Sequence, residues 1–361
     1  MINEDYVKLI VLKKILFVLF FNYPLLTPNG NVYKFNIFVH KTDQPMNGRI
    51  LIIGACGQIG TELTAALRER FGAERVIASD IRRGNDKLMA SGPFEIADAM
   101  DYKAIEDIIY RHKVDTVYLM AAMLSAVAER FPKKAWDLNM NSLFNILNLA
   151  KEGKVEKVFW PSSIAVFGPS TPKQDTPQQT IMEPTTVYGI SKQTGERWCE
   201  YYHKKYGIDV RSVRYPGLIS YTTEPGGGTT DYAVEIYHRA LKHQHYRCFL
   251  EADTMLPMMY MEDAIRATIS IMDADADTIK IRSSYNLAAI SFDPEESAAS
   301  IRKHIPDFKI TYEPDFRQEI ADSWPQSIDD SEARKDWNWK HTYDLNDITS
   351  VMLKNLKSQY V

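Results

Sequence analysis

Short apolar runs alternate with segments whose apolar positions recur every three or four residues, from residue 49 onward. The runs are rich in Val, Ile, Leu and Phe, as expected of buried parallel strands, and lie at 49–53, 75–79, 114–120, 157–162 and 209–214. Amphipathic helices are expected between them, at 59–71, 102–112, 133–151 and 188–206. This βαβ alternation predicts an α/β fold with a doubly wound parallel sheet, which binds ligands at the carboxyl ends of its strands.

The regular alternation ends after Pro216, where a glycine-rich stretch, EPGGGTTDY, and several short elements follow. We therefore expect a nucleotide-binding domain at 47–217, to which later segments return, and a smaller, mainly substrate-binding lobe at 218–361. Residues 1–46 are expected to be an extension outside the core fold, because Met46 directly precedes the first strand.

The extension differs in composition from the rest of the chain, since its first 45 residues contain no alanine. Its apolar run at 15–21 is shorter than the roughly 20 residues that cross a bilayer. Glu4 and Asp5 stand where a signal peptide carries basic residues, and arginine and serine, typical of transit peptides, are missing. An appendage or an upstream translated segment is the favoured interpretation, and a membrane-surface anchor is the alternative.

Composition is that of an ordinary globular protein, with 45% hydrophobic and 25% charged residues and a formal net charge of −4. This balance gives no reason to expect a nucleic acid as partner, and no integral membrane span is expected. The three cysteines lack CxxC spacing, so we expect neither a disulfide framework nor a metal site. A reducing, cytoplasmic location follows, or the mitochondrial matrix if the chain is eukaryotic.

Three glycines, Gly54, Gly57 and Gly60, separate the first strand from the first helix in ILIIGACGQIGTEL. Glycine lets backbone N–H groups approach a pyrophosphate, and the helix that follows offers the positive end of its dipole. Asp80 ends the next strand, 20 residues after Gly60, where a carboxylate binds the adenosine ribose and repels a 2′-phosphate. The pattern favours NAD over NADP, although Arg82 and Arg83 could serve a 2′-phosphate.

Tyr188 and Lys192 lie four residues apart in VYGISK and therefore share a helix face. An ammonium about 4 Å from a phenol is worth roughly 4 kcal/mol at an effective dielectric of ~20, or up to about three pKa units before desolvation. We therefore expect Tyr188 to act as a general base and Lys192 to lower its pKa. Ser162 and Ser163 follow a strand and could hold the substrate oxygen.

Together these motifs resemble the extended short-chain dehydrogenase/reductase superfamily, from about residue 49 almost to the C-terminus. Within it, RYPGLIS, PGGGTTDYAVEIY, LPMMYMEDAIRATI and DSWPQSIDDSEARKDW resemble NAD-dependent L-threonine 3-dehydrogenases of the epimerase-like, metal-free type. NWKH at 338–341 departs from the family pattern, and the extension has no counterpart in it.

The resemblance implies a Rossmann-type fold and a role for each matching position. The cofactor NAD would be bound by Gly54, Gly57, Gln58, Ile59, Gly60, Asp80, Ile81, Arg82, Asp98, Ala99, Asn139, Tyr188, Lys192 and Leu218. Within this set Asn139 would support the active-site backbone. The catalytic residues would be Tyr188, Lys192 and, of the two serines, Ser163.

L-Threonine is the expected substrate, and its carboxylate and ammonium need separate partners. Backbone N–H groups at 226–228, with Thr229 or Thr230, could form an anion-binding nest that Ser125 completes. Asp231 could accept from the ammonium or cap a helix, and both alternatives stay open. The resemblance also implies a homodimer built on the helices near 133–151 and 188–206. The product would be 2-amino-3-oxobutyrate, passed to a 2-amino-3-ketobutyrate CoA ligase.

Two other functions share parts of this pattern. Nucleotide-sugar epimerases and dehydratases typically carry an asparagine after the RY strand, where this chain has Gly217. A non-catalytic NAD-sensing Rossmann protein would be expected to lack the tyrosine or the serine, and both are present.

Overall fold

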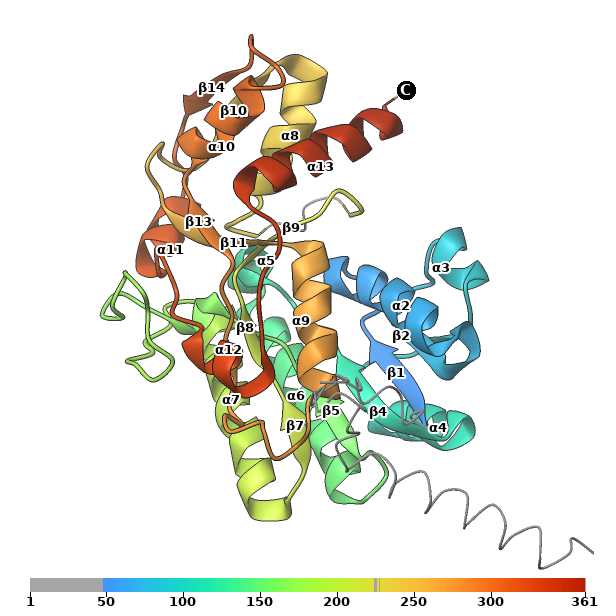
Figure 1. Cartoon of the computed structure of the whole chain (residues 1–361). Helices are drawn as coiled ribbons and strands as arrows, with labels where there is room; N and C mark the ends of the chain where they lie inside the picture. Colours follow the sequence, from blue (N-terminus) through green and yellow to red (C-terminus); the bar gives the residue numbers. More distant parts are fainter. Residues whose placement is uncertain (1–47, 224–225, 227, 361) are drawn as a thin grey trace, which may run out of the picture. The chain divides into compact units, whose positions relative to one another are not determined.

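The computed structural model describes residues 48–223, 226 and 228–360, so the extension predicted at 1–46 lies outside the described residues. Residues 48–361 form one compact unit, shown in Figure 1. At its centre is a parallel sheet in the order β3-β2-β1-β4-β5-β7. Its strands are β1 (Arg49–Ile53), β2 (Val76–Asp80), β3 (Phe94–Ile96), β4 (Val114–Leu119), β5 (Lys157–Phe159) and β7 (Asp209–Arg211).

This strand order is that of a doubly wound Rossmann fold, as predicted. Successive strands are added on one side of β1 up to β3 and on its other side from β4 onward. A ligand crevice is expected outside the carboxyl ends of β1 and β4, where this order reverses. The helices of this half are α2 (Gln58–Phe71), α3 (Asp86–Ala90), α4 (Tyr102–His112), α5 (Ser125–Arg130), α6 (Pro132–Lys151) and α7 (Val187–Tyr206). The short 3-10 helices η1 (Ala73–Arg75) and η2 (Ile164–Val166) join them.

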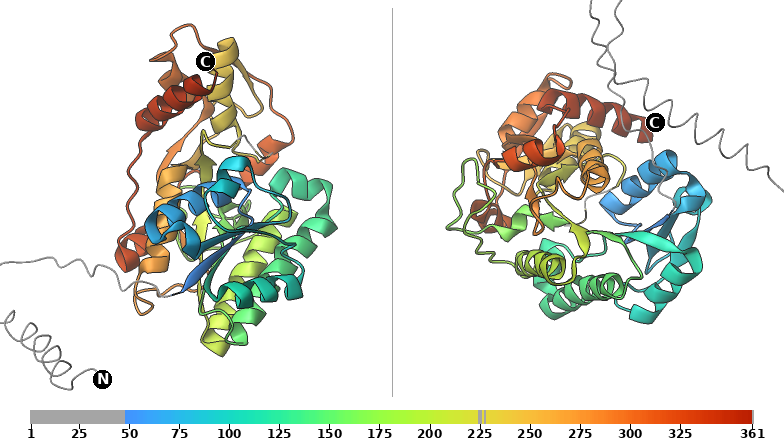
Figure 2. Two further views of the ribbon diagram at one scale, coloured as in Figure 1. Left: turned by 90° about the vertical axis from the view of Figure 1, so that its right-hand side faces the viewer. Right: turned by 60° about the horizontal axis from the view of Figure 1, so that its bottom comes forward.

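Helices cover both faces of the sheet, as Figure 2 shows. The apolar sides of α4, α6 and α7 pack on one face, where Leu51, Val117 and Val158 join a buried core with Ile105, Leu143 and Cys199. Helix α2 contacts β1 and β2 on the other face and also contacts α9 (Met261–Asp273). Because α9 follows residue 218 in sequence, a late segment returns to the nucleotide-binding half.

Two of the predicted strands are wrong in extent, because each apolar run is divided between two sheets. Residues 157–162 give β5 and then β6 (Ser162–Ser163), and residues 209–214 give β7 and then β8 (Val213–Tyr215). Strand β8 lies between β6 and β12 (Tyr285–Asn286) in a separate parallel sheet. The chain therefore leaves the main sheet at Pro161, and this exit carries the two serines away from β5.

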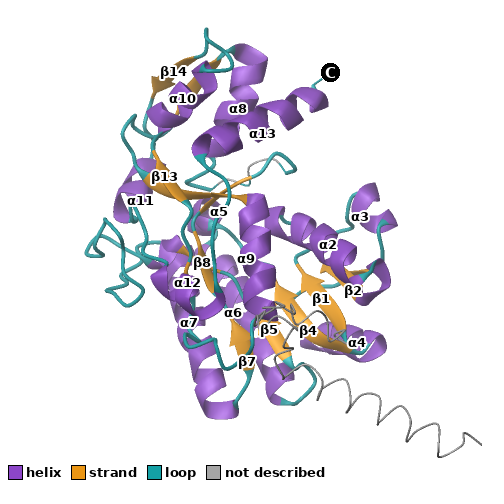
Figure 3. Cartoon of the chain, viewed as in Figure 1, coloured by secondary structure: helices purple, strands orange, loops and turns teal. Residues whose placement is uncertain are grey.

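The rest of the chain surrounds a second core, drawn by secondary structure in Figure 3. Its strands are β9 (Gly217–Ile219), β10 (His245–Cys248), β11 (Leu256–Tyr260), β13 (Ile290–Phe292) and β14 (Lys309–Tyr312). Its helices are α8 (Tyr232–His243), α10 (Pro294–Arg302), α11 (Arg317–Ser323), α12 (Ser331–Trp337) and α13 (Leu345–Gln359). Residues 164–167, directly after Ser163, belong to this core as well, so the serine strand joins both halves.

Among the described residues, no helix combines the length and the apolar character needed to span a bilayer.

Candidate active site

The glycine turn sits between β1 and α2 and depends on two close backbone contacts. Gly54 has φ +89°, and a Cβ on it would lie 2.5 Å from the Ala121 nitrogen. A Cβ on Gly60 would lie 2.1 Å from the Gly54 carbonyl oxygen. Gly57 differs, because a Cβ there would meet only that same oxygen, at 3.4 Å. Packing therefore requires Gly54 and Gly60, whereas Gly57 leaves space on the side of the ligand crevice.

A cavity of about 1000 Å³ lies beside this turn. Its walls include seven of the predicted cofactor residues, namely Gly54, Gly57, Asp80, Ile81, Arg82, Asp98 and Ala99. Asp80 Oδ2 accepts a hydrogen bond from the Cys56 backbone N–H at 2.9 Å, which fixes the carboxylate at the cavity wall. The exposed Arg82 donates from Nη2 to the Cys56 carbonyl oxygen at 3.3 Å. Asp80 and Arg82 thus flank the turn from the same side.

These residues fit an adenine dinucleotide. The first backbone N–H groups of α2 have no partner within the helix, and Gly57 leaves room for a phosphate in front of them. The carboxylate of Asp80 at the end of β2 is placed to accept from ribose hydroxyls. The structure brings Gln58, Ile59, Gly60 and Leu218 to a second, adjoining cavity.

Asn139 lies behind the wall rather than on it. It is buried on α6, and its Oδ1 accepts from the Met123 N–H at 2.8 Å. Its Nδ2 donates to the Met123 carbonyl oxygen at 3.2 Å and to Ser191 Oγ at 3.1 Å. Because Asn139 lines neither cavity, direct cofactor contact is not what this geometry supports. It holds the backbone that follows β4 against α7.

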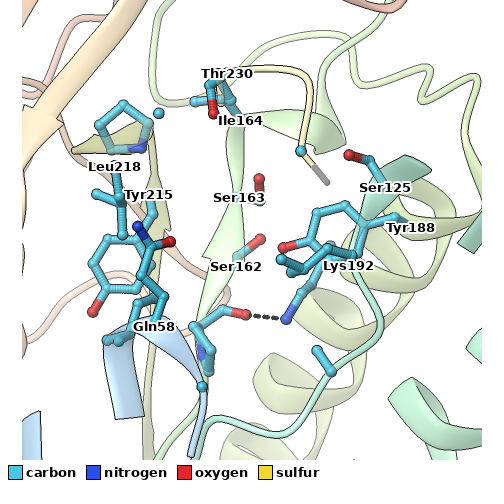
Figure 4. Close-up of a pocket in the computed structure, with 18 of the residues that line it drawn as sticks. Gln58, Ser125, Ser162, Ser163, Ile164, Tyr188, Lys192, Tyr215, Leu218 and Thr230 are labelled. Atoms are coloured by element: carbon cyan, nitrogen blue, oxygen red, sulfur yellow. Dashed lines mark hydrogen bonds between the residues drawn. The ribbon is translucent and has the colours of Figure 1, made fainter. Parts of the chain in front are cut away.

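The adjoining cavity, of about 210 Å³, contains the predicted catalytic residues. Figure 4 shows the Tyr188 hydroxyl pointing toward the two serines, with Ser125 on the far side of the tyrosine ring. Helix α7 delivers Tyr188 in its first turn, after Thr186 caps the helix by accepting from the Gly189 N–H at 3.1 Å. A Cβ on Gly189 would lie 2.1 Å from the Ala165 oxygen, so this glycine lets α7 approach η2.

The pKa of Tyr188 is raised, whereas we expected Lys192 to lower it. Lys192 Nζ lies 5.5 Å from the centre of the Tyr188 ring and donates to the Pro161 carbonyl oxygen at 2.6 Å. Burial raises the pKa of Tyr188 to about 12, against a smaller opposite effect of its hydrogen bond with Ser163. Burial lowers the pKa of Lys192 to about 7, with Cys199 and Glu196 opposing it. Desolvation, which the expectation named without giving it a magnitude, is the largest influence on the pKa of both groups.

The structure separates the two serines by their partners. Ser162 Oγ is buried and donates to Glu196 Oε1 at 2.6 Å. Ser163 is less buried, its Oγ accepts from the Ala165 N–H at 3.2 Å, and its hydroxyl is within hydrogen-bonding reach of Tyr188. Both line the cavity, but the Ser162 hydroxyl is bonded to Glu196, whereas that of Ser163 interacts with the phenol. This is the serine that the resemblance selected.

The predicted substrate loop is described only in part, because residues 224, 225 and 227 lie outside the described residues. Gly228, Thr229, Thr230 and Asp231 all line the cavity, as does Ser125. The Gly228 N–H donates to Asp231 Oδ2 at 2.7 Å, so this donor of the predicted anion nest is already engaged. Asp231 stands at the N-cap position of α8 without a side-chain capping hydrogen bond, and its carboxylate also lines the cavity.

Thr229 is the more informative member of this loop. It is 1% exposed, and the described residues supply no hydrogen-bond partner for its Oγ1. A buried hydroxyl without a partner costs free energy, so a ligand that supplies one is favoured.

Several residues that line the cavities were missed from the sequence. Trp324, in the DSWP segment after α11, is 6% exposed and lines the smaller cavity. Tyr215 and Pro216 line the same cavity, and Lys133 and Lys134 line the larger one. Pro216 could have been found from its place at the end of a predicted strand. Nothing in the sequence around Trp324 marks it, because it reaches the site through the packing of distant segments.

Comparison with known proteins identifies the family. The model of the NAD dependent epimerase/dehydratase family matches residues 50–288. The chain belongs to this family. A Staphylococcus haemolyticus relative, an uncharacterized epimerase/dehydratase, is 51% identical over 313 residues, which cover 86% of this chain and 98% of the relative.

Solved structures give the family match more detail. A GalE-like L-threonine dehydrogenase from Cupriavidus necator, in its holo form, is 56% identical, covering 85% of this chain and 99% of that chain, with a TM-score of 0.84. An L-threonine dehydrogenase from Phytophthora infestans is 50% identical, covering 86% and 99%, with a TM-score of 0.83. A UDP-glucose 4-epimerase from Thermotoga maritima is 19% identical with a TM-score of 0.75, a likeness of fold alone.

Proposed function

We propose that this protein oxidises L-threonine at C3 with NAD⁺, giving 2-amino-3-oxobutyrate and NADH. The observation that carries the proposal is the meeting of Tyr188, Ser163 and Lys192 in one cavity that adjoins the glycine turn. Two relatives named as L-threonine dehydrogenases are 56% and 50% identical over almost their whole length, which supports the same substrate.

The proposed reaction begins with the substrate hydroxyl between Ser163 and Tyr188. Ser163 Oγ donates a hydrogen bond that fixes the hydroxyl oxygen, and Tyr188 Oη takes the hydroxyl proton as the C3–O bond becomes a carbonyl. NAD⁺, when bound, accepts the hydride that leaves C3. Lys192 Nζ, held by the Pro161 carbonyl oxygen at 2.6 Å, favours the phenolate by its positive charge.

The substrate's charged groups are proposed to meet the loop before α8 and the start of α5. Thr229 offers a hydroxyl that the described residues leave without a partner, and Ser125 opens α5, whose positive end favours a carboxylate. The Asp231 carboxylate is proposed to accept from the substrate ammonium while keeping the Gly228 N–H. Trp324 closes the cavity against water.

The second candidate, a nucleotide-sugar epimerase, is disfavoured by the same cavity. About 210 Å³ beside the nicotinamide end favours a small second substrate over a nucleoside diphosphate sugar. A Cβ on Gly217 would lie 2.3 Å from Met258 Sδ and 2.8 Å from Thr230 Cγ2, so the asparagine of the epimerases would have to displace both side chains.

Purified protein with NAD⁺ tests the proposal through the absorbance of reduced nicotinamide. L-Threonine should give turnover, with D-threonine as the stereochemical control and a UDP-hexose as the competing substrate. Turnover of the UDP-hexose with none of L-threonine would overturn the assignment.

We also propose a homodimer through the outer sides of α6 and α7. Phe144 and Trp198 pack edge to face there with ring centres 5.0 Å apart, beside the exposed Tyr201. Light scattering of the purified chain should give twice the monomer mass, and Tyr201→Glu should reduce it to the monomer. A monomeric wild type, as in one 48% identical relative named as monomeric, would contradict the proposal.

A further inference from the structure

A buried ion pair lies directly behind the serines and is not used by the proposed reaction. Glu196 and Arg214 are 0% and 2% exposed. The Arg214 guanidinium donates two hydrogen bonds of 2.8 Å to the Glu196 carboxylate, from Nε to Oε1 and from Nη2 to Oε2. Paired geometry of this kind fixes both planes relative to each other.

Glu196 continues a row on α7. Tyr188, Lys192 and Glu196 follow at intervals of four residues, so all three project from one face of the helix. Glu196 accepts a hydrogen bond from Ser162 Oγ at 2.6 Å, in addition to the two from Arg214. The helix that carries the phenol therefore also holds the strand that carries the serines.

Helix α7 binds the start of strand β6 and the residue before it, Pro161. Lys192 Nζ binds the Pro161 carbonyl oxygen, and Glu196 binds the Ser162 hydroxyl. Ser163 comes next, and its backbone pairs with Tyr215 of β8, while Ser162 pairs with Arg214. Any displacement of Ser162 is thus passed directly to Ser163.

Arg214 extends the connection to further segments. Its Nη1 donates to Asn286 Oδ1 at 2.9 Å and to the Gln178 carbonyl oxygen at 3.1 Å. The residues that follow it, 215–218, line the reaction cavity. One salt bridge therefore joins α7, β6 and the β8–β9 connection, which together form three walls of the cavity.

Resting on the proposed function, we propose that Glu196 is a positioning residue: through Ser162 it sets the separation between the Ser163 and Tyr188 hydroxyls. Glu196 lines neither of the two cavities. A buried ion pair is weak evidence for stability, because desolvation offsets much of its attraction, and a role in geometry accounts for its orientation.

The test compares Ser162→Ala, Glu196→Gln and the double variant. Ser162→Ala keeps the Glu196–Arg214 ion pair and removes the hydrogen bond between residue 162 and Glu196. It should lower kcat about tenfold and leave the NAD⁺ dissociation constant and the pH profile of kcat unchanged. Glu196→Gln should lower kcat similarly and move the pH profile of kcat to lower pH, because the negative charge that raises the pKa of Lys192 is lost. Since both act through one link, the double variant should lose little more than either single variant.

Asp209→Asn is the matched control, because Asp209 pairs with Arg211 at 2.8 Å and Arg282 at 2.6 Å at the other end of the strands. It should lower Tm and leave kcat and its pH profile unchanged. Crystal structures of wild type and Ser162→Ala supply a readout without turnover, and the Ser163–Tyr188 hydroxyl distance should lengthen in the variant.

Wild-type kcat in Ser162→Ala, an unchanged hydroxyl distance, or additive losses in the double variant would each overturn the role of Glu196. If Glu196→Gln does not fold, Ser162→Ala and its crystal structure decide the matter. A wild-type protein inactive on L-threonine would instead overturn the proposed function, and the distance comparison would still test the positioning role.

Discussion

Lys192 lies over the ring of Tyr188: Nζ is 5.5 Å from the ring centre and donates to the Pro161 carbonyl oxygen. Both side chains are desolvated, and burial moves their pKa values in the directions that favour the neutral forms. Formation of the phenolate therefore needs a favourable charge that burial does not supply, and the proposed NAD⁺ would bring one when bound.

Tyr188→Phe tests the base. Loss of the phenol oxygen removes the proton acceptor, so kcat should fall by about 10²–10⁴-fold, while NAD⁺ affinity, measured by tryptophan fluorescence, stays within about twofold. Tyr237→Phe, which removes a buried hydroxyl bonded to Thr349 at 3.2 Å, is the control and should remain active. Substantial activity in Tyr188→Phe would mean that another group takes the proton.

Lys192→Met tests the burial of the lysine through stability. The folded protein holds Lys192 at a pKa of about 7, below its ordinary value of 10.5, so between these values the unfolded chain binds more protons. Wild-type stability should therefore rise with pH from about 7 to 10 relative to Lys192→Met, by at most about 1.4 kcal/mol per pH unit. Urea unfolding at several pH values measures this difference, and parallel curves would contradict it.

Gly57→Ala and Gly60→Ala separate ligand space from packing. The added methyl at residue 57 has room in the protein, so Tm should hold, while the NAD⁺ dissociation constant should rise roughly tenfold as the methyl meets the phosphate. At residue 60 the methyl meets backbone at 2.1 Å and should cost about 1–3 kcal/mol of stability. Calorimetry and cofactor titration of both variants give the comparison, and a Gly57→Ala protein with unchanged affinity would place the phosphates elsewhere.

Asp80→Asn tests the choice of dinucleotide. The amide oxygen can still accept from the Cys56 N–H, so the turn should be retained, but the charge that repels a 2′-phosphate is lost. The ratio of kcat/KM for NAD⁺ to that for NADP⁺ should fall by roughly tenfold, as expected for losing a charged hydrogen bond. An unchanged ratio would assign the selectivity to another group, with Arg82 the first to examine.

The main sheet was predictable because its signals are local. Each buried strand is a short apolar run, and β1 has the predicted bounds of 49–53. The transfers at Pro161 and Ser212 were not, because an apolar run has the same appearance whether it stays in one sheet or passes to the next. The edge strand β3 was missed for a related reason: it is short and partly exposed.

The site was predictable where its residues share a turn or a helix, and less so where it is assembled by packing. Tyr188 and Lys192 are neighbours on α7, and the sequence alone brings them together. Trp324 comes from the far end of the chain, and the bond that holds Ser162 is made by Glu196, about one turn beyond Lys192. Desolvation of the pair was also invisible, because burial depends on what the rest of the chain places around it.

The turn after Ser163 has a consequence for synthesis. Residues Ile164 to Phe167 are packed in the same core as Ile348 and Leu356 of the last helix. A ribosome has therefore to release nearly the whole polypeptide before the serine's surroundings can close. C-terminally shortened chains would lack part of the core that packs directly behind Ser163.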